Sequence, residues 1–220
     1  MRTIAFALAA LLSCVPLRAG AQTAPPAVPP AKAAQPIGSV ALVNAGFEST
    51  LPGKLGAPQG WWTVQHAGPV SYTFTLDTTK PRSGERSLKL ENVGPEPFGT
   101  IFQPVDATPY RGKKVHLAAW IRSEGVAGNR YGAGAGLHLQ AMKGSYPVVQ
   151  ETVRKDAIKG TTDWTRYEVA VDVPVEADRI ELGLNLFGPG TVWLDDVALD
   201  VMDASTTAAP PGARVLMRRP

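Results

Sequence analysis

The stretch that most constrains the fold is residues 177–201, which reads ADRIELGLNLFGPGTVWLDDVALDV. Between positions 180 and 187 every second residue is apolar. The apolar set is Ile180, Leu182, Leu184 and Leu186, and the alternate set is Glu181, Gly183, Asn185 and Phe187. A period of two predicts a strand with one buried face. Gly188-Pro189-Gly190 predicts a turn, and residues 191–199 predict a second apolar strand, so this stretch forms a hairpin.

The second strand of this hairpin contains two adjacent acids, Asp195 and Asp196. A carboxylate inside a strand costs free energy unless a hydrogen-bond donor or a positive charge compensates it. Solvent or a neighbouring arginine would do so, and so would a bound cation. The residues alone leave these alternatives open.

The rest of the chain repeats the same kind of pattern. Short alternating runs are separated by Gly, Pro, Asn and Asp, and no helical period persists. The predicted strands are residues 41–43, 71–77, 87–91, 99–105, 113–123, 134–142, 150–158, 165–173, 180–187 and 191–201. This spacing predicts an all-β antiparallel sandwich over residues 39–202, a length sufficient for one domain with a full core.

The N-terminus has the composition of a signal peptide. Arg2 supplies the positive start, and the apolar run of residues 4–12 is too short to span a bilayer. The small residues 19–21 predict cleavage after Ala21. Cys14 allows a second interpretation, because residues 11–14 loosely resemble a lipoprotein box that would anchor the protein through a lipid. Both interpretations predict export to the periplasm or beyond, with no transmembrane segment in the mature chain.

Both flanks of the predicted domain differ from it in composition. Residues 22–38 are rich in Pro and Ala and predict an extended linker, and residues 203–220 predict a disordered basic tail. The whole chain carries a net charge of +3, with 22 Lys and Arg against 19 Asp and Glu. Six of the basic residues lie in the flanks, namely Arg2, Arg18, Lys32, Arg214, Arg218 and Arg219. Residues 39–202 are therefore close to neutral, which argues against a nucleic-acid partner.

A series of short motifs runs through residues 39–202. They are Asn44-Ala45-Gly46-Phe47-Glu48, Gly60-Trp61, Ser83-Gly84-Glu85-Arg86-Ser87-Leu88, Tyr110-Arg111-Gly112-Lys113, Ala119-Trp120-Ile121-Arg122, residues 162–167 (TDWTRY) and residues 190–197 (GTVWLDDV). In this order they resemble the galactose-binding-like jelly roll of the carbohydrate-binding modules of bacterial glucanases and xylanases. They also resemble uncharacterised jelly-roll segments of bacterial envelope proteins. The resemblance implies the fold more strongly than it implies sugar binding, because most of these motifs are structural.

The resemblance also implies a structural calcium ion joining the first and last strands. The matching side chains are Glu48 and Asp196, with backbone carbonyls near Ser83 and Gly84. Calcium prefers several oxygen ligands from carboxylates and carbonyls, and a site made by distant segments would stabilise the sandwich. The alternative is a surface cluster without a metal, with Arg86 nearby.

Motifs of catalysis are sparse in this sequence. The three histidines, His66, His116 and His138, form no HExxH motif, and there is no GxSxG elbow. The adjacent acids Asp195 and Asp196 are a poor pair for glycoside hydrolysis, because neighbours on a strand point to opposite faces. The sequence therefore predicts a non-catalytic protein.

Trp120 is the most unusual residue of the predicted strands, because a large aromatic lies on the polar side with His116 and Arg122. Either a loop or another strand covers it, or it is a platform for a ligand. If adjacent strands bring His138 and Asn185 beside it, one ring and several hydrogen-bonding groups would suit a sugar. The predicted ligand-binding residues are Trp120, His138, Gln140, Asn185, Trp62, Tyr131 and Tyr146. The hypothesis is an exported module that binds a glycan or related envelope polymer. The alternatives are a protein–protein assembly module of the envelope and an accessory fragment that has lost its hydrolase.

Overall fold

The computed structural model describes residues 36–52, 54–152, 157–202 and 214–215. Contacts divide the chain into two compact units, residues 1–31 and 32–220, and every described residue belongs to the second. The predicted signal peptide, Cys14 and most of the predicted linker and tail lie outside the described residues. No described helix is long and apolar enough to cross a membrane.

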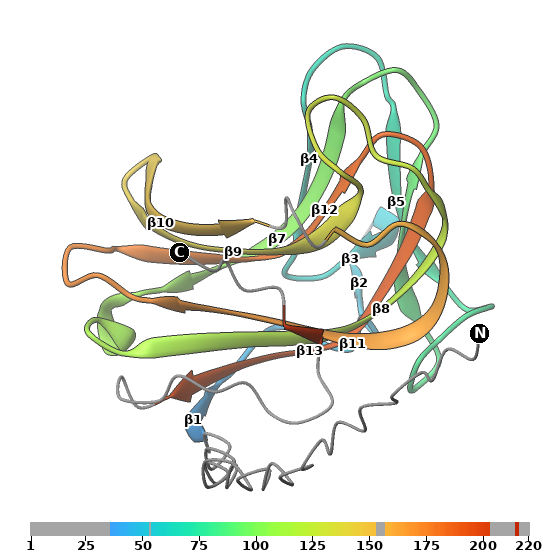
Figure 1. The fold of residues 1–220 in the computed structure, drawn as a ribbon. Coiled ribbons are helices and arrows are strands. Elements are labelled where there is room, and N and C mark those ends of the chain that lie inside the picture. The colour runs from blue at the N-terminus through green and yellow to red at the C-terminus, as the bar shows by residue number, and fades with distance from the viewer. Residues whose placement is uncertain (1–35, 53, 153–156, 203–213, 216–220) are drawn as a thin grey trace, which may run out of the picture. The chain divides into compact units, whose positions relative to one another are not determined.

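The described residues form strands almost throughout (Figure 1). In chain order the strands are β1 Pro36–Val40, β2 Thr50–Leu51, β3 Lys54–Pro58, β4 Trp62–Gln65, β5 Tyr72–Asp77, β6 Ser87–Asn92, β7 Phe98–Asp106, β8 Lys114–Val126, β9 Ala135–Lys143, β10 Tyr146–Thr152, β11 Gly160–Asp172, β12 Arg179–Phe187, β13 Thr191–Met202 and β14 Arg214–Val215. A 3₁₀ helix, η1 Thr108–Tyr110, precedes β8.

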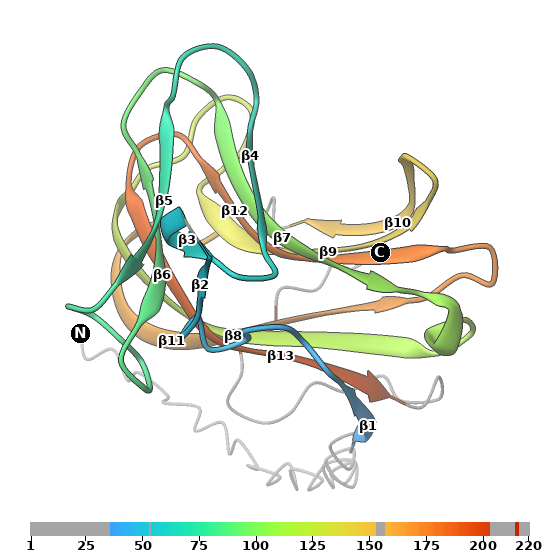
Figure 2. The same cartoon turned by 180° about the vertical axis from the view of Figure 1, so that it is seen from behind.

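Two sheets pack face to face, as the views in Figures 1 and 2 both show. The seven-stranded sheet has the order β14-β11-β8-β13-β6-β5, and β1 also pairs with β13. The five-stranded sheet has the order β10-β9-β12-β7-β4. All pairs in the two sheets are antiparallel except β14 with β11. The fold is therefore the predicted jelly-roll β-sandwich.

The core fills the space between the two sheets. Ile180, Leu182, Leu184 and Leu186 of β12 are all fully buried, as their alternation predicts. The inward residues of β8, Val115, Leu117, Ala119 and Ile121, are equally buried. Burial of this apolar surface is the main stabilising contribution, because residues 36–215 contain no cysteine that could form a disulfide.

The structure differs from the sequence prediction mainly at the start of the chain. The first strand is β1 Pro36–Val40, which lies partly in the predicted linker, whereas the predicted strand at 41–43 is a turn region. The short strands β2, β3 and β4 were not predicted. These segments lack a run of alternating apolar residues, and β4 has three exposed residues out of four, so its pairing with β7 leaves little trace in the sequence.

Candidate ligand-binding face

The candidate site is the outer face of the five-stranded sheet. Antiparallel register aligns Trp62 of β4 with Phe102 of β7, Gly183 of β12 and His138 of β9 in one row across four strands. Directly paired residues lie on the same side of a sheet. The next rows contain Thr100 with Asn185, and Glu181 with Gln140. We call these eight residues the aromatic–polar face.

The two aromatic rings lie at one end of this row. Trp62 belongs to the edge strand and is 63% exposed, whereas Phe102 on the next strand is half-buried. Gly183 follows with no side chain, and a Cβ at this position would clash with the backbone oxygen of Ile101. The close approach of the β7 backbone therefore requires glycine here, and no side chain stands between Phe102 and His138 in this row.

The polar side chains of the face are largely buried and bonded to one another. The Thr100 hydroxyl donates to Asn185 Oδ1 over 2.7 Å, and Asn185 Nδ2 lies 3.5 Å from His138 Nδ1. His138 and Asn185 are 8% and 7% exposed. Burial lowers the pKa of His138 to about 4, against a smaller opposing effect of Glu181. The imidazole is therefore neutral at pH 7.

A second chain of hydrogen bonds fixes the amide of Gln140. Its Nε2 donates to Glu181 Oε2 over 2.6 Å, and Arg179 Nε donates to Glu181 Oε1 over 2.8 Å. Both carboxylate oxygens of Glu181 therefore accept a hydrogen bond. The positive charge of Arg179 balances the negative charge of Glu181. The Gln140 oxygen is left as an acceptor.

Four of the seven predicted ligand-binding residues thus lie together on this face: Trp62, His138, Gln140 and Asn185. Trp120 does not join them. It lies on β8 of the seven-stranded sheet, between β11 and β13, so the expectation that adjacent strands bring His138 and Asn185 beside it is wrong. Alternation shows which side of its own strand a residue occupies but not which sheet the strand joins.

The ring of Trp120 is covered by a side chain rather than open. The guanidinium carbon of Arg82 lies 4.3 Å from the ring centroid, and the tryptophan is half-buried. This stacking is a cation–π interaction, which gives the large aromatic a structural reason to lie on the outer side. The alternative in which a loop covers Trp120 is therefore the one that the structure supports.

The two predicted tyrosines lie away from the central row. Tyr131 is in the loop between β8 and β9, where Arg130 donates to its hydroxyl over 2.6 Å. Tyr146 begins β10 and pairs with Lys143, and the alternation along β9 places Lys143 on the side opposite to Gln140. Both tyrosines are exposed, at 55% and 78%.

Phe102, Thr100 and Gly183 were not predicted as site residues. The signal was present, because Thr100, Phe102 and Pro104 alternate with Ile101, Gln103 and Val105 within a predicted strand. Glu181 and Asn185 both lie on the outer side of β12, as the alternation along this strand predicts. What the sequence lacks is the pairing that joins β7 to β12.

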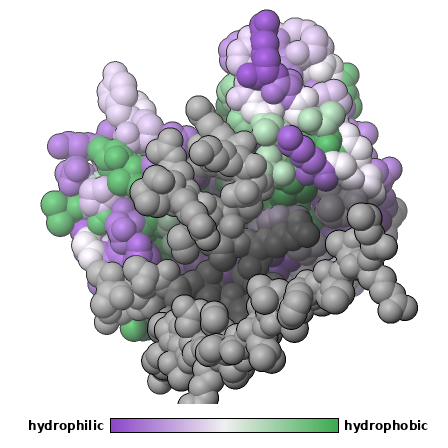
Figure 3. All heavy atoms as spheres, in the orientation of Figure 1, coloured by the Kyte–Doolittle hydropathy of each residue, from purple (hydrophilic) through white to green (hydrophobic). Residues whose placement is uncertain are grey.

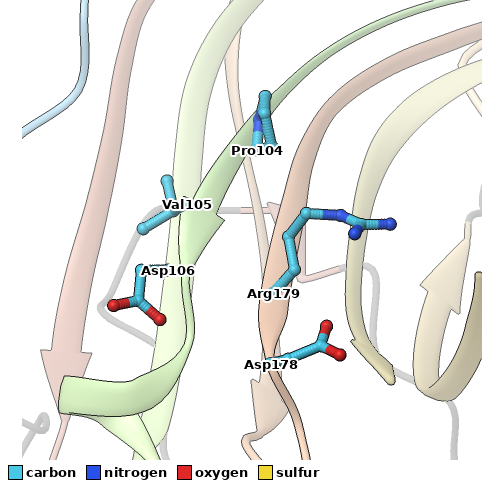
Figure 4. Close-up of a pocket in the computed structure, with 5 residues that line it drawn as sticks. All are labelled: Pro104, Val105, Asp106, Asp178 and Arg179. Carbon is cyan, nitrogen blue, oxygen red and sulfur yellow. The ribbon is translucent and has the colours of Figure 1, made fainter. Parts of the chain in front are cut away.

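A pocket of about 340 Å³ lies beside the aromatic–polar face, where β7 and β12 come together at their ends (Figure 4). It is lined by Pro104, Val105, Asp106, Asp178 and Arg179. Arg179 of β12 and Asp178, the residue before this strand, are already engaged, because Asp178 Oδ2 accepts from Gly144 N over 2.6 Å and Arg179 Nη2 donates to Gly144 O over 3.2 Å. These bonds hold the β9–β10 turn, so the charged side chains of the pocket have a structural role.

The paired acids of β13 are satisfied by the loop of residues 82–86. Asp195 is fully buried and accepts hydrogen bonds from the backbone N–H groups of Arg82, Ser83 and Asp196. Asp196 has a φ of 49°, which belongs to an irregularity in the pairing with β8, and its carboxylate accepts from Ser83 Oγ over 2.6 Å. Burial raises the pKa of Asp195 to about 6 against the effect of these hydrogen bonds.

Glu48, the other predicted calcium ligand, approaches the same loop. Its carboxylate accepts from the backbone N–H groups of Glu85 and Arg86, and it fills a space at Gly84 where a Cβ would clash with Oε1. Arg86 Nη1 donates to the Glu48 carbonyl and not to the carboxylate. Glu48 and Asp196 therefore converge on one loop from segments that are far apart in the sequence. Among the described residues, no group of three or more His, Cys, Asp or Glu side chains is arranged to hold a metal.

Comparisons with known proteins bear on the fold. No family model matches the sequence. A stretch of 150 residues, 66% of this chain, is 28% identical to the uncharacterized HTH-type transcriptional regulator YbfP of Bacillus subtilis (strain 168). The chain spans 48% of that protein, so about half of the relative has no counterpart in this match.

Solved structures with the same fold are mostly sugar-binding proteins. The CBM22-1 xylan-binding domain of Paenibacillus barcinonensis Xyn10C superposes with a TM-score of 0.51 at 14% identity, over 80% of this chain and 99% of that domain. A putative sugar binding protein of Bacteroides thetaiotaomicron gives 0.50 at 13% identity, over 72% and 98%. The enzymatically active domain of tailspike protein 4 of bacteriophage CBA120 gives 0.50 at 15% identity, over 65% of this chain and 19% of that chain. The protein therefore has the jelly-roll fold of the carbohydrate-binding modules.

Proposed function

We propose that this protein is a non-catalytic module that binds a glycan through the aromatic–polar face. The observation that carries the proposal is the row of Trp62, Phe102, Gly183 and His138, in which exposed aromatic surface continues into buried polar groups. A sugar ring has an apolar face and a polar rim, so it matches such a surface. The shared fold with a xylan-binding domain supports this assignment.

The expected binding mode follows from the side chains. The Trp62 ring stacks on the apolar face of a sugar unit, and Phe102 extends the apolar surface toward the centre of the sheet. Gly183 lets the ligand approach the backbone. His138, Asn185 and Gln140 then supply hydrogen bonds to the hydroxyl groups.

Absence of catalysis is part of the proposal. Glu181 is the carboxylate on this face, and both its oxygens are engaged with Gln140 and Arg179. A glycosidase needs a second carboxylate beside the scissile bond, and the face as defined contains none.

A glycan array probed with the full mature chain tests the proposal. We expect binding to a small set of uncharged glycans. A folded protein that binds no glycan on the array would contradict the proposal.

Binding of a protein partner in the envelope is the second candidate function. It is favoured by the edge strand β4, where Trp62 and Val64 are 63% and 46% exposed and adjacent along one side. On the side seen in Figure 3, however, apolar residues form small separate groups among polar ones.

We also propose that calcium binds where Glu48 and Asp196 converge on the loop of residues 82–86. The two carboxylates are 148 positions apart in the sequence, so a shared ion would join β13 to the segment after β1. Calcium that binds only the folded state stabilises it by mass action, so chelation should lower the melting temperature and added calcium should restore it. Melting curves that are unchanged by chelator and by calcium would contradict this proposal.

The last part of the proposal is export of the protein with cleavage after Ala21. It rests on the charged start, the short apolar run and the small residues at the cleavage site. Mass spectrometry of the protein from its native host should find a mature chain that begins at Gln22. A chain that begins at a lipid-modified Cys14 would contradict cleavage at Ala21 and place the protein on a membrane surface.

A further inference from the structure

The hydrogen bonds on the aromatic–polar face determine where the single proton of the His138 ring resides. The Thr100 hydroxyl donates to Asn185 Oδ1, which leaves the Asn185 amino group facing His138 Nδ1 at 3.5 Å, a long hydrogen bond. An amino group can only donate, so this contact favours an unprotonated Nδ1. In a neutral imidazole the proton is then on Nε2.

The Nε2–H group has no protein acceptor among the described hydrogen bonds, and Nε2 is not one of the buried side-chain atoms that lack a partner. The group therefore reaches the surface, where water or a ligand that supplies an acceptor can bond to it. Two residues further along β9, the oxygen of Gln140 is left as an acceptor by the bond from its Nε2 to Glu181. The strand therefore presents a donor and an acceptor on residues whose Cα atoms are about 7 Å apart.

We propose that Thr100 and Asn185 are positioning residues that hold His138 as the Nε2–H tautomer, so that this ring donates to a hydroxyl or ring oxygen of an uncharged glycan. The inference rests on the proposed function, because it assigns the polar half of the same face. An anionic sugar fits less well, because Glu181 contributes a carboxylate to the face and Arg179 is already bonded to it.

Asn185→Asp is the sharpest test, because it keeps the size of the side chain but replaces the donor with an acceptor. A carboxylate beside Nδ1 favours the Nδ1–H tautomer, which removes the proton from Nε2. The ring nitrogens of wild type should show a protonated Nε2 by ¹⁵N NMR at pH 7, and the variant should show the reverse. Affinity for an uncharged glycan identified on the array should fall about tenfold, as loss of one hydrogen bond implies.

Two further variants separate a positioning role from general damage. His138→Gln retains an N–H donor near the position of Nε2 and should keep most of the affinity, whereas His138→Leu should lose about tenfold. Thr75→Val removes an exposed hydroxyl from β5 in the other sheet and serves as the control for Thr100→Val, which should weaken binding. Melting curves show whether each variant is folded.

A wild-type ring protonated on Nδ1, or an Asn185→Asp variant that is folded and binds like wild type, would overturn the inference while leaving the glycan proposal intact. If wild type has the expected tautomer and binds no glycan, the proposed function fails and the ligand assignment fails with it. Equal loss of affinity in His138→Gln and His138→Leu would also overturn the donor role.

Discussion

Trp62→Ala is expected to reduce glycan affinity by about 1–3 kcal/mol, by analogy with aromatic stacking on flat ligands, and thereby to abolish binding at array concentrations. The ring is 63% exposed on an edge strand, so it contributes little to the core. Its removal should therefore leave the free energy of unfolding nearly unchanged. Titration calorimetry and urea unfolding measure the two quantities on the same variant.

Trp120→Ala is the matched control, because it removes the same side chain from the outer side of the other sheet. Trp120 is half-buried under Arg82, so this variant should lose stability and keep glycan affinity. The reverse pattern, with binding lost in Trp120→Ala and retained in Trp62→Ala, would place the ligand on the seven-stranded sheet. The proposed site would then be wrong.

The fold could be predicted largely because apolar residues occupy every second position in its long strands. The alternation of leucines in β12 and of Val115 to Ile121 in β8 follows from one buried face in a sandwich, and turn residues separate the strands. Phe47, which lies in the first of the short motifs, is fully buried. Such signals are local, so a single sequence shows them.

The candidate site depends on pairing between distant strands, which local patterns do not encode. Trp62 and His138 are 76 positions apart and meet in one row only because β4 joins β7 and β9 joins β12. Trp120 has a more conspicuous pattern than Trp62, yet it lies on the other sheet. The bonds that order the polar residues, such as the one from Thr100 to Asn185, likewise follow from register.

The slope of the free energy of unfolding against pH should have opposite signs in two single variants, His138→Gln and Asp195→Asn. In the wild type these two buried groups have opposite effects on that slope. The pKa of Asp195 is raised to about 6 in the folded protein, and that of His138 is lowered to about 4. Their ordinary values are near 4 and 6.5. Both groups therefore titrate differently in the folded and unfolded chains over the same range, from about pH 4 to pH 6.5.

The signs follow from which state holds the proton. As pH rises from 4 to 6, the unfolded chain releases the Asp195 proton while the folded protein retains it, so about 3 kcal/mol of stability is lost. Over nearly the same range the unfolded chain retains the His138 proton that the folded protein has released, so rising pH adds about 3 kcal/mol. In the wild type the two effects nearly cancel.

Each variant should therefore expose the effect of the remaining group. Relative to wild type, His138→Gln should lose stability as pH rises from 4 to 6.5, and Asp195→Asn should gain it. The slopes are compared rather than the absolute stabilities, because both oxygens of Asp195 accept backbone hydrogen bonds and the asparagine loses one acceptor. Urea unfolding at a series of pH values, with chelator present throughout to exclude calcium, measures the slopes.

The double variant is the internal check. Asp195 and His138 lie on different sheets, on β13 and β9, so their contributions should add, and the double variant should run parallel to wild type across the whole range. Curves of the single variants that also run parallel to wild type would show that neither group has a shifted pKa. Burial is the cause given for both pKa shifts. If the slope differs from wild type in only one variant, burial shifts the pKa of the residue replaced in that variant and not the pKa of the other.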